Sequence, residues 1–120
     1  MSLEAAGQLW VEPVGSLIVA RVRGRATQAL IIECQRRVVE LQGDTGRNRI
    51  LYDALELERP PLDVVLTQQE LASELKHPSV KIAIVVPNTG IAYLARLAFG
   101  AANHRVFYND IAAATRWLEE

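Results

Sequence analysis

The amino-acid sequence predicts an α/β fold in which helices pack on a mostly parallel sheet that begins with an antiparallel edge hairpin. Apolar runs with the composition of strands alternate with stretches whose apolar residues have helical spacing. Glycine and proline separate these segments at regular intervals. Residues 82–86 are apolar throughout, which is typical of a strand covered on both faces. We therefore expect the element order ββαβαβαβα.

The composition predicts one globular domain over residues 1–120. Half of the residues are apolar and 22% are charged, which is enough to bury a sizeable core. The net charge of −1 provides no broad basic field for nucleic acid or an anionic membrane. No apolar run is long enough to span a bilayer, and one cysteine excludes an internal disulfide. We expect a cytoplasmic protein with no nucleic-acid partner and no stable membrane insertion.

The first two strands are expected at residues 9–14 and 17–23, joined by a tight turn at Gly15-Ser16. Pro13 has no N–H to donate to a sheet, so the first strand is predicted to lie at an edge. Composition leaves open a homodimer through this edge strand or through an exposed helix face.

An amphipathic helix is expected at residues 26–42, with Gly43 as its left-handed C-cap. Cys34 lies on its apolar stripe, which favours a buried side chain over a nucleophile. The strand expected at residues 48–55 is entered from a helix and should run parallel to the strand before it.

The start of the next helix has two interpretations, because Pro60-Pro61 prevents regular structure before it. Asp63 would cap a helix that starts at Val64, whereas Thr67 and Glu70 have the spacing of a capping box. In both cases the helix should end by His77, since proline follows it.

The C-terminal part predicts a central parallel strand at residues 80–86, a helix at 91–102, a short strand at 105–108 and a last helix capped by Asp110. The aromatic side chains fall mostly at apolar positions, so we expect them in the core. They are Tyr52, Tyr93, Phe99, Phe107 and Tyr108.

Several pieces of the chain resemble the SpoIIAA-like family, a branch of the STAS (sulfate transporter and anti-sigma-factor antagonist) fold grouped with the CRAL-TRIO lipid-binding domains. The matching pieces are Val22-Arg23-Gly24, Ile50-Leu51-Tyr52-Asp53, residues 77–86 and the C-terminal run from Arg105 to Asp110 followed by Ala113 and Trp117-Leu118. The C-terminal run is the most specific, and together the pieces cover nearly the whole chain.

The resemblance implies a non-enzymatic regulatory or protein-interaction module that binds a protein partner. Anti-sigma-antagonist proteins are switched by phosphorylation of a serine in an Asp-Ser pair that opens a helix. This sequence has Asp63-Val64 where that pair would stand, and therefore no acceptor hydroxyl. Thr67 is the nearest substitute, although helix capping explains it more simply.

Six residues are predicted to bind a ligand or partner: Asp53, Asp63, Thr67, Asn88, Thr89 and Gly90. Asp53 ends a strand, and open α/β sheets bind ligands beyond such ends, but a lone carboxylate also commonly bonds nearby backbone amides. The free N–H groups after Pro87 could hold a phosphate, a carboxylate or a lipid headgroup, and Asn88 or Thr89 equally suits a helix cap.

Two other functions stay open at this point. A carrier of a small apolar or lipid-like ligand would need a cavity of about 300 Å³ or more between the sheet and the third and fourth helices. An enzyme would need two or more perturbed titratable groups meeting Asp53 in one cleft. His77 and His104 have no partner identifiable in sequence, so we predict no catalytic residue, metal or cofactor.

Overall fold

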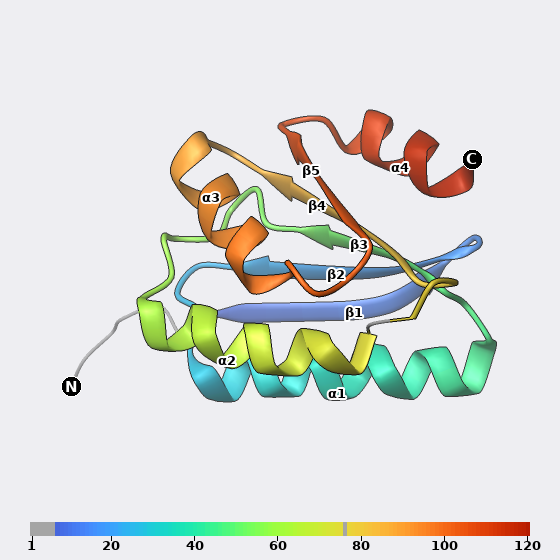
Figure 1. Cartoon of the computed structure of the whole chain (residues 1–120), viewed down its shortest axis with the longest axis horizontal. Helices are drawn as coiled ribbons and strands as arrows, with labels where there is room; N and C mark the ends of the chain where they lie inside the picture. Colours follow the sequence, from blue (N-terminus) through green and yellow to red (C-terminus); the bar gives the residue numbers. More distant parts are fainter. Residues whose placement is uncertain (1–6, 76) are drawn as a thin grey trace.

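The computed structural model describes residues 7–75 and 77–120, which form one five-stranded sheet and four α-helices (Figure 1). The elements follow the predicted order, with one short 3₁₀ helix, η1, added after the second helix. They are β1 (Gln8–Val14), β2 (Leu17–Arg23), α1 (Gln28–Thr45), β3 (Arg49–Asp53), α2 (Leu62–Ala72), η1 (Ser73–Leu75), β4 (Lys81–Val86), α3 (Thr89–Ala98), β5 (His104–Tyr108) and α4 (Ile111–Glu119). None of the described helices combines the length and apolar character needed to cross a bilayer.

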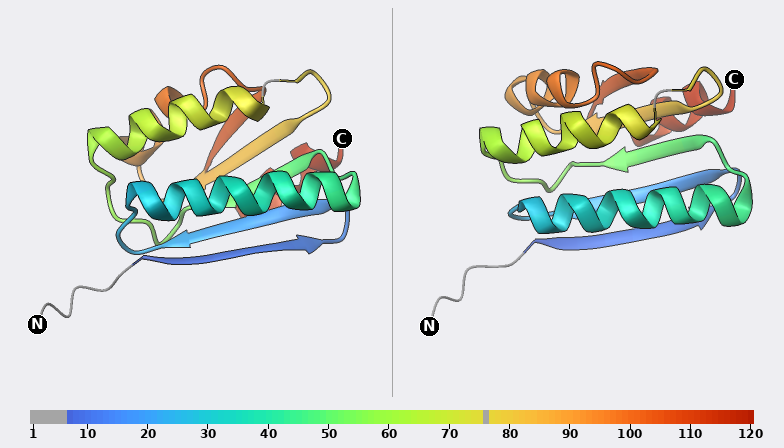
Figure 2. Two further views of the ribbon diagram at one scale, coloured as in Figure 1. Left: turned by 90° about the horizontal axis from the view of Figure 1, so that it is seen from below. Right: turned by 60° about the horizontal axis from the view of Figure 1, so that its bottom comes forward.

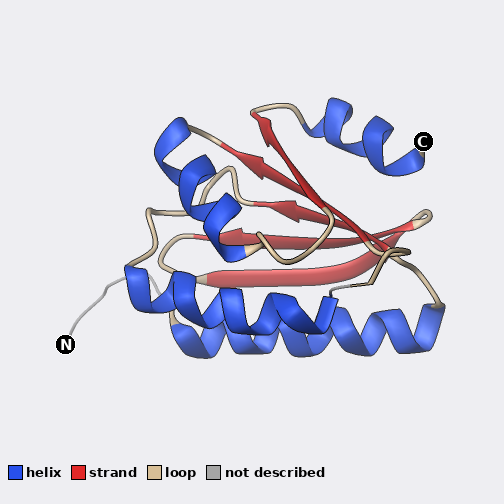
Figure 3. Ribbon diagram, viewed as in Figure 1, coloured by secondary structure: helices blue, strands red, loops and turns tan. Residues whose placement is uncertain are grey.

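The strands lie side by side in the order in which they occur along the chain. β1 and β2 are antiparallel, and every later pair is parallel, as predicted. Connections between adjacent parallel strands are right-handed, so three successive crossovers place their helices on the same face of the sheet. α1, α2 and α3 therefore share one face, and α4 lies apart from them (Figures 2 and 3).

β4 lies inside the sheet, between β3 and β5, with both neighbours parallel to it. The side chains of residues 82–86 are all buried. Ile82, Ile84 and Val86 contact the α1–α3 layer, whereas Ala83 and Val85 face α4. The unbroken apolar run is confirmed as a strand covered on both faces.

The N-terminal hairpin also agrees with the prediction. Val14 pairs with Leu17 across the two-residue turn, and Gly15 has a positive φ of 58°. Glycine is preferred at the first central position of such a turn because it has no Cβ to clash. β1 forms the sheet edge, and Pro13 lies in it.

α1 is longer than predicted, and Gly43 is not its cap. Gly46, at a φ of 71°, takes the left-handed conformation and donates its N–H to the carbonyl of Gln42. Gly43 lies within the last turns, where a glycine is tolerated at a modest cost. The extra turn brings the chain close to the start of β3.

Both predicted starts of α2 are wrong. The helix begins at Leu62, and the carbonyl of Pro61 accepts hydrogen bonds from the N–H groups of Val64 and Val65. A proline loses nothing there, since the N–H that it lacks would have no partner inside the helix. The double proline therefore starts the helix, which places Asp63 in the first turn and Thr67 within the helix.

α3 is offset from its expected range, since it starts two residues earlier and ends at Ala98. The aromatic prediction is correct for Tyr52 and Phe99, which are buried with ring centroids 5.0 Å apart. It is wrong for Tyr93 and Tyr108, whose exposed fractions are 61% and 44%.

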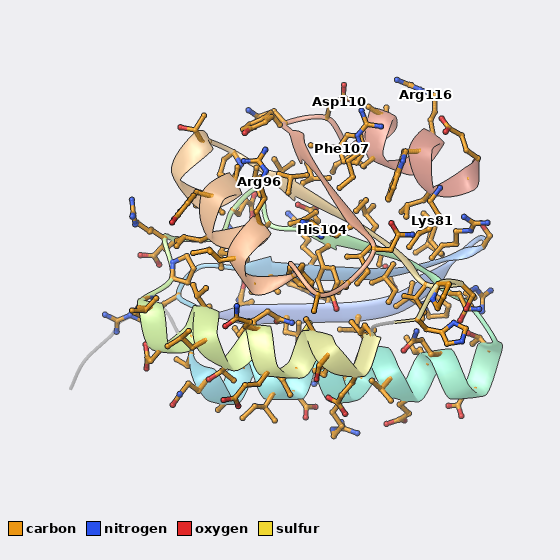
Figure 4. The ribbon with its side chains drawn as sticks, viewed as in Figure 1. Lys81, Arg96, His104, Phe107, Asp110 and Arg116 are labelled. Atoms are coloured by element: carbon orange, nitrogen blue, oxygen red, sulfur yellow. The ribbon has the colours of Figure 1, made fainter. Side chains whose placement is uncertain are left out.

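The cap of α4 agrees with the prediction, since Asp110 Oδ1 accepts from the N–H of Ala113 at 2.9 Å (Figure 4). Lys81 of β4 binds the C-terminal end of α4. Its ammonium donates to the carbonyl of Trp117 at 2.7 Å and lies 4.3 Å from the centre of that indole ring. A cation over an aromatic face adds to the hydrogen bond.

Candidate functional site

Asp53 lies at the carboxyl end of β3, where its carboxylate makes mainly local contacts. Oδ1 accepts from the N–H of Leu55 at 3.1 Å, and Oδ2 is 3.8 Å from Nε of Arg21. The first contact is the ordinary bond of an aspartate to a backbone amide two residues later. Asp53 is thus held in place by its own loop and by β2.

Two acidic and two basic side chains form a charged cluster on the part of the sheet beside α4. Glu56 Oε2 accepts from Arg23 Nε at 2.9 Å and from Arg21 Nη2 at 3.3 Å, and Arg21 also approaches Asp53. The guanidinium of Arg21 lies 5.5 Å from the ring centre of Trp10. The charges balance, so this cluster presents no concentrated field of one sign.

The basic residues of α1 are paired as well. Glu33 accepts from both Arg36 and Arg37, and Arg36 also bonds Glu40. The two guanidinium groups lower the pKa of Glu33 to about 2 because they stabilise its carboxylate. These ion pairs account for the basic residues of this helix.

The loop after β4 caps α3. Asn88 Oδ1 accepts from the N–H of Ile91 at 2.9 Å, and Thr89 is the first helical residue. A Cβ added to Gly90 would lie 3.4 Å from Nη1 of Arg59, so a guanidinium from the segment before α2 reaches this helix start. The fold therefore brings Arg59 to Gly90 at the start of α3, which sequence reasoning did not anticipate.

Thr67 lies away from these residues, on the side of α2 that faces α1. Its hydroxyl donates to the carbonyl of Asp63 at 3.0 Å and accepts from Nε2 of Gln28 at 3.1 Å. The expectation that Thr67 caps a helix is wrong, because the helix starts five residues earlier. A phosphate on Thr67 would not meet the free N–H groups of a helix N-terminus.

One apolar cavity of about 80 Å³ lies between the sheet and the layer of α1, α2 and α3. Its wall includes Cys34, Tyr52 and Gln68, and burial raises the pKa of the Cys34 thiol to about 12. The volume is well below the roughly 300 Å³ of a small ligand site. A single ligand space between the sheet and both the third and fourth helices, as expected from sequence, is not possible, because α3 and α4 lie on opposite faces of the sheet.

The two histidines make local contacts. Nδ1 of His77 is 2.7 Å from Oγ of Ser79, and Nδ1 of His104, at the start of β5 (Figure 4), is 3.0 Å from the carbonyl of Ala102. Within residues 7–75 and 77–120, no group of three His, Cys, Asp or Glu side chains is placed to hold a metal ion.

Sequence reasoning missed an apolar surface on two neighbouring helices, here called the α2–α3 face. Gln69 Nε2 donates to the carbonyl of Leu97 at 3.4 Å, which joins the two helices. The face consists of the exposed side chains Leu62 (62%), Leu66 (49%), Tyr93 (61%) and Leu97 (38%). One signal was present, since Leu62 and Leu66 lie outside the helical stripe of the buried residues Val64, Val65 and Ala72.

No protein-family model matches the chain, and no curated protein sequence matches it either. Among solved structures, an anti-sigma factor antagonist from Mycobacterium paratuberculosis superposes with a TM-score of 0.74 at 11% identity, over 96% of each chain. An uncharacterized protein of the DUF3478 family from Shewanella loihica, which has a SpoIIAA-like fold, superposes with a TM-score of 0.64 at 16% identity, over 98% of each chain. The fold of this chain is therefore the SpoIIAA-like, STAS-type α/β fold that its sequence resembles.

Proposed function

We propose that this protein is a non-enzymatic regulatory module of the cytoplasm that binds a protein partner through the α2–α3 face. The observation that carries the proposal is the exposure of Leu62, Leu66, Tyr93 and Leu97 on two helices that are fastened to each other. The likeness in fold to an anti-sigma factor antagonist supports a regulatory role.

The α2–α3 face has the chemistry of a protein-binding surface. Fully burying a leucine or a similar apolar side chain contributes about 1.5–3 kcal/mol, so two or three such contacts supply much of a moderate affinity. Arg96 on α3 donates to the hydroxyl of Tyr108 at 3.1 Å and adds a polar group to the apolar side chains of this helix. Interfaces commonly combine an apolar centre with a polar rim.

The two helices hold this face rigidly. Val64, Val65 and Ala72 anchor α2 in the core, and Ile91 and Ala92 anchor α3. A surface whose backbone is fixed before binding loses little conformational entropy when the partner arrives. The exposed side chains therefore need no rearrangement of the fold to make contact.

The titratable groups support a binding role over a catalytic one. The groups with shifted pKa values are Glu33, Cys34, Arg36 and Tyr52. Glu33 and Arg36 are paired with each other on the surface of α1, whereas Cys34 and Tyr52 are buried. Within the described part of the chain, the Asp53 carboxylate contacts the N–H of Leu55 and the guanidinium of Arg21, and neither group is an acid or a nucleophile.

The test is quantitative affinity capture with the tagged full-length protein and a variant carrying Leu66→Lys and Tyr93→Lys. We expect the amount of a partner protein captured by the wild type to fall at least tenfold with the double variant, because charges would replace the apolar contacts. Ile111→Lys is the control, since Ile111 is also an exposed apolar side chain but lies on α4.

Equal capture by wild type and double variant would contradict the proposal, provided that both melt within a few degrees of each other. Native mass spectrometry of the freshly purified protein gives an independent result. A small molecule retained at one equivalent would favour the carrier, whereas a bare protein mass agrees with the interaction module.

A further inference from the structure

Among residues 7–75 and 77–120, no strand pairs with the outer side of β1. Within the described residues β1 pairs only with β2, through a two-residue turn closed by Val14 and Leu17. In such a hairpin the closing pair exchanges hydrogen bonds, and bonded pairs recur at every second residue. Trp10 and Glu12 therefore bond to β2, while the N–H and C=O groups of Leu9 and Val11 point outward from the sheet.

The side chains on the solvent side of β1 are suited to a copy of the same strand. Trp10 is 43% exposed, although it is the largest side chain of the strand. Gln8 and Glu12 lie two residues before and after it on the same side and are also exposed. One is an amide and the other a carboxylate, so an antiparallel copy would place a donor opposite an acceptor.

We propose that two copies of this chain associate by pairing β1 with β1, antiparallel, about a two-fold axis at Trp10. Leu9 of each copy then lies opposite Val11 of the other, and these residues form four N–H···O=C bonds. Gln8 faces Glu12 across the axis on both sides. The two five-stranded sheets become one continuous sheet of ten strands.

The proposed register is the one that uses the outward groups best. An axis at Val11 would set Leu9 opposite Pro13, which has no N–H to give. An axis at Glu12 would bring two carboxylates face to face. With the axis at Trp10, the two indoles meet in a pair without hydrogen bonds, where side chains approach most closely, and aromatic pairs are favoured there.

α1 is compatible with this arrangement. It packs against β1 and β2 and meets α2 on one flank through Gln28 and Gln35. At 100° per residue, Glu33 and Arg37 lie on the opposite flank, which faces the open edge. A two-fold axis makes α1 of one copy antiparallel to α1 of the other. Glu33 of one copy can then face Arg37 of the other across the edge.

The association is tested by sedimentation equilibrium of the full-length protein over a concentration series. We expect a species of twice the 13.3 kDa chain mass, and a dimer dissociation constant raised at least tenfold by Trp10→Arg, which sets two charges together at the axis. Ile111→Arg is the control, because Ile111 is also an exposed apolar side chain but lies on α4, away from β1 and from the α2–α3 face. A monomer at every concentration would overturn the proposal, as would a dimer unaffected by Trp10→Arg.

The register is tested by disulfide trapping. Trp10→Cys should link to itself under mild oxidation, because residues opposite each other in a pair without hydrogen bonds have suitable Cβ spacing. Glu12→Cys alone should not link, whereas a mixture of Gln8→Cys and Glu12→Cys should form a mixed dimer. The native Cys34 should not form a disulfide in this experiment, because burial raises its pKa and keeps the thiol protonated. Faster linkage of Glu12→Cys than of Trp10→Cys would overturn this register.

Discussion

The two faces of the sheet are covered to different extents. Three helices close one face over a large apolar cluster that reaches from β2 to β4, whereas α4 covers the other face with a small cluster around Leu51, Val85 and Leu118. Beyond α4, that second face carries Trp10 and the charged cluster of Arg21, Arg23, Asp53 and Glu56.

The difference teaches where stability and binding reside in this molecule. Crossovers of one hand concentrate the helices, and therefore the core, on a single face. The free energy of folding should come mainly from that face. The surfaces left over, which are the outer sides of α2 and α3 and the edge at β1, are those on which the two proposals rest.

The largest expected effect concerns Cys34, which lies at the centre of the three-helix face. At about pH 8 its reaction with a water-soluble disulfide reagent should be about a thousandfold slower than that of an unfolded cysteine, because a pKa of about 12 leaves little thiolate. The measurement is thiol release in buffer and in denaturant. Equal rates would mean that the three-helix face opens readily.

Ile50→Ala should lower the free energy of unfolding by about 4 kcal/mol, because Ile50 is fully buried in the large cluster and leaves a cavity. Urea denaturation followed by circular dichroism measures the change. Ile111→Ala, at an exposed position, should change it by no more than about 0.5 kcal/mol. A loss for Ile50→Ala below about 1 kcal/mol would contradict a tightly packed core.

Leu118→Ala tests the small apolar cluster under α4, again by urea denaturation. Leu118 is also fully buried, but among the described helices α4 alone covers its face and can settle onto the sheet, so we expect about 2–3 kcal/mol. The contrast between the two faces would be lost if Leu118→Ala cost more than Ile50→Ala.

The smallest effect is the pH dependence of Glu33 on the outer side of α1. Its pKa is lowered from 4.5 to about 2, so the stabilisation is present above pH 4.5 and is lost as the pH falls toward 2. NMR titration of the side-chain carboxyl should show the low pKa. Arg36→Gln should raise it toward the ordinary value, and an unchanged pKa in that variant would exclude the assigned cause.

The order of the elements could be predicted because each depends on local pattern. The apolar run at residues 82–86, the Asp110 cap and Pro13 at an edge each have a physical reason within a few residues. The boundaries of α1 and α2 could not be predicted in this way. Either of two glycines could end α1, and two prolines can either prevent a helix or begin one, as they do in α2.

The candidate site was less predictable. Asp53 and Asn88 make the local bonds that their positions suggest, and whether any of the six named residues binds a ligand or partner stays a prediction. The exposure of Tyr93 and the approach of Arg59 to Gly90 depend on how α3 is placed beside α2. No spacing within either helix contains that information.

The sequence by itself determined which segments become strands or helices and that β4 is buried on both faces, because hydrophobic periodicity and chain stiffness act over a few residues. Only the tertiary structure decided which helices share a face, how small the apolar cavity between the sheet and the helices is and which apolar side chains remain in water. Those properties follow from packing between elements far apart in the chain, where the position of one helix sets the exposure of its neighbour.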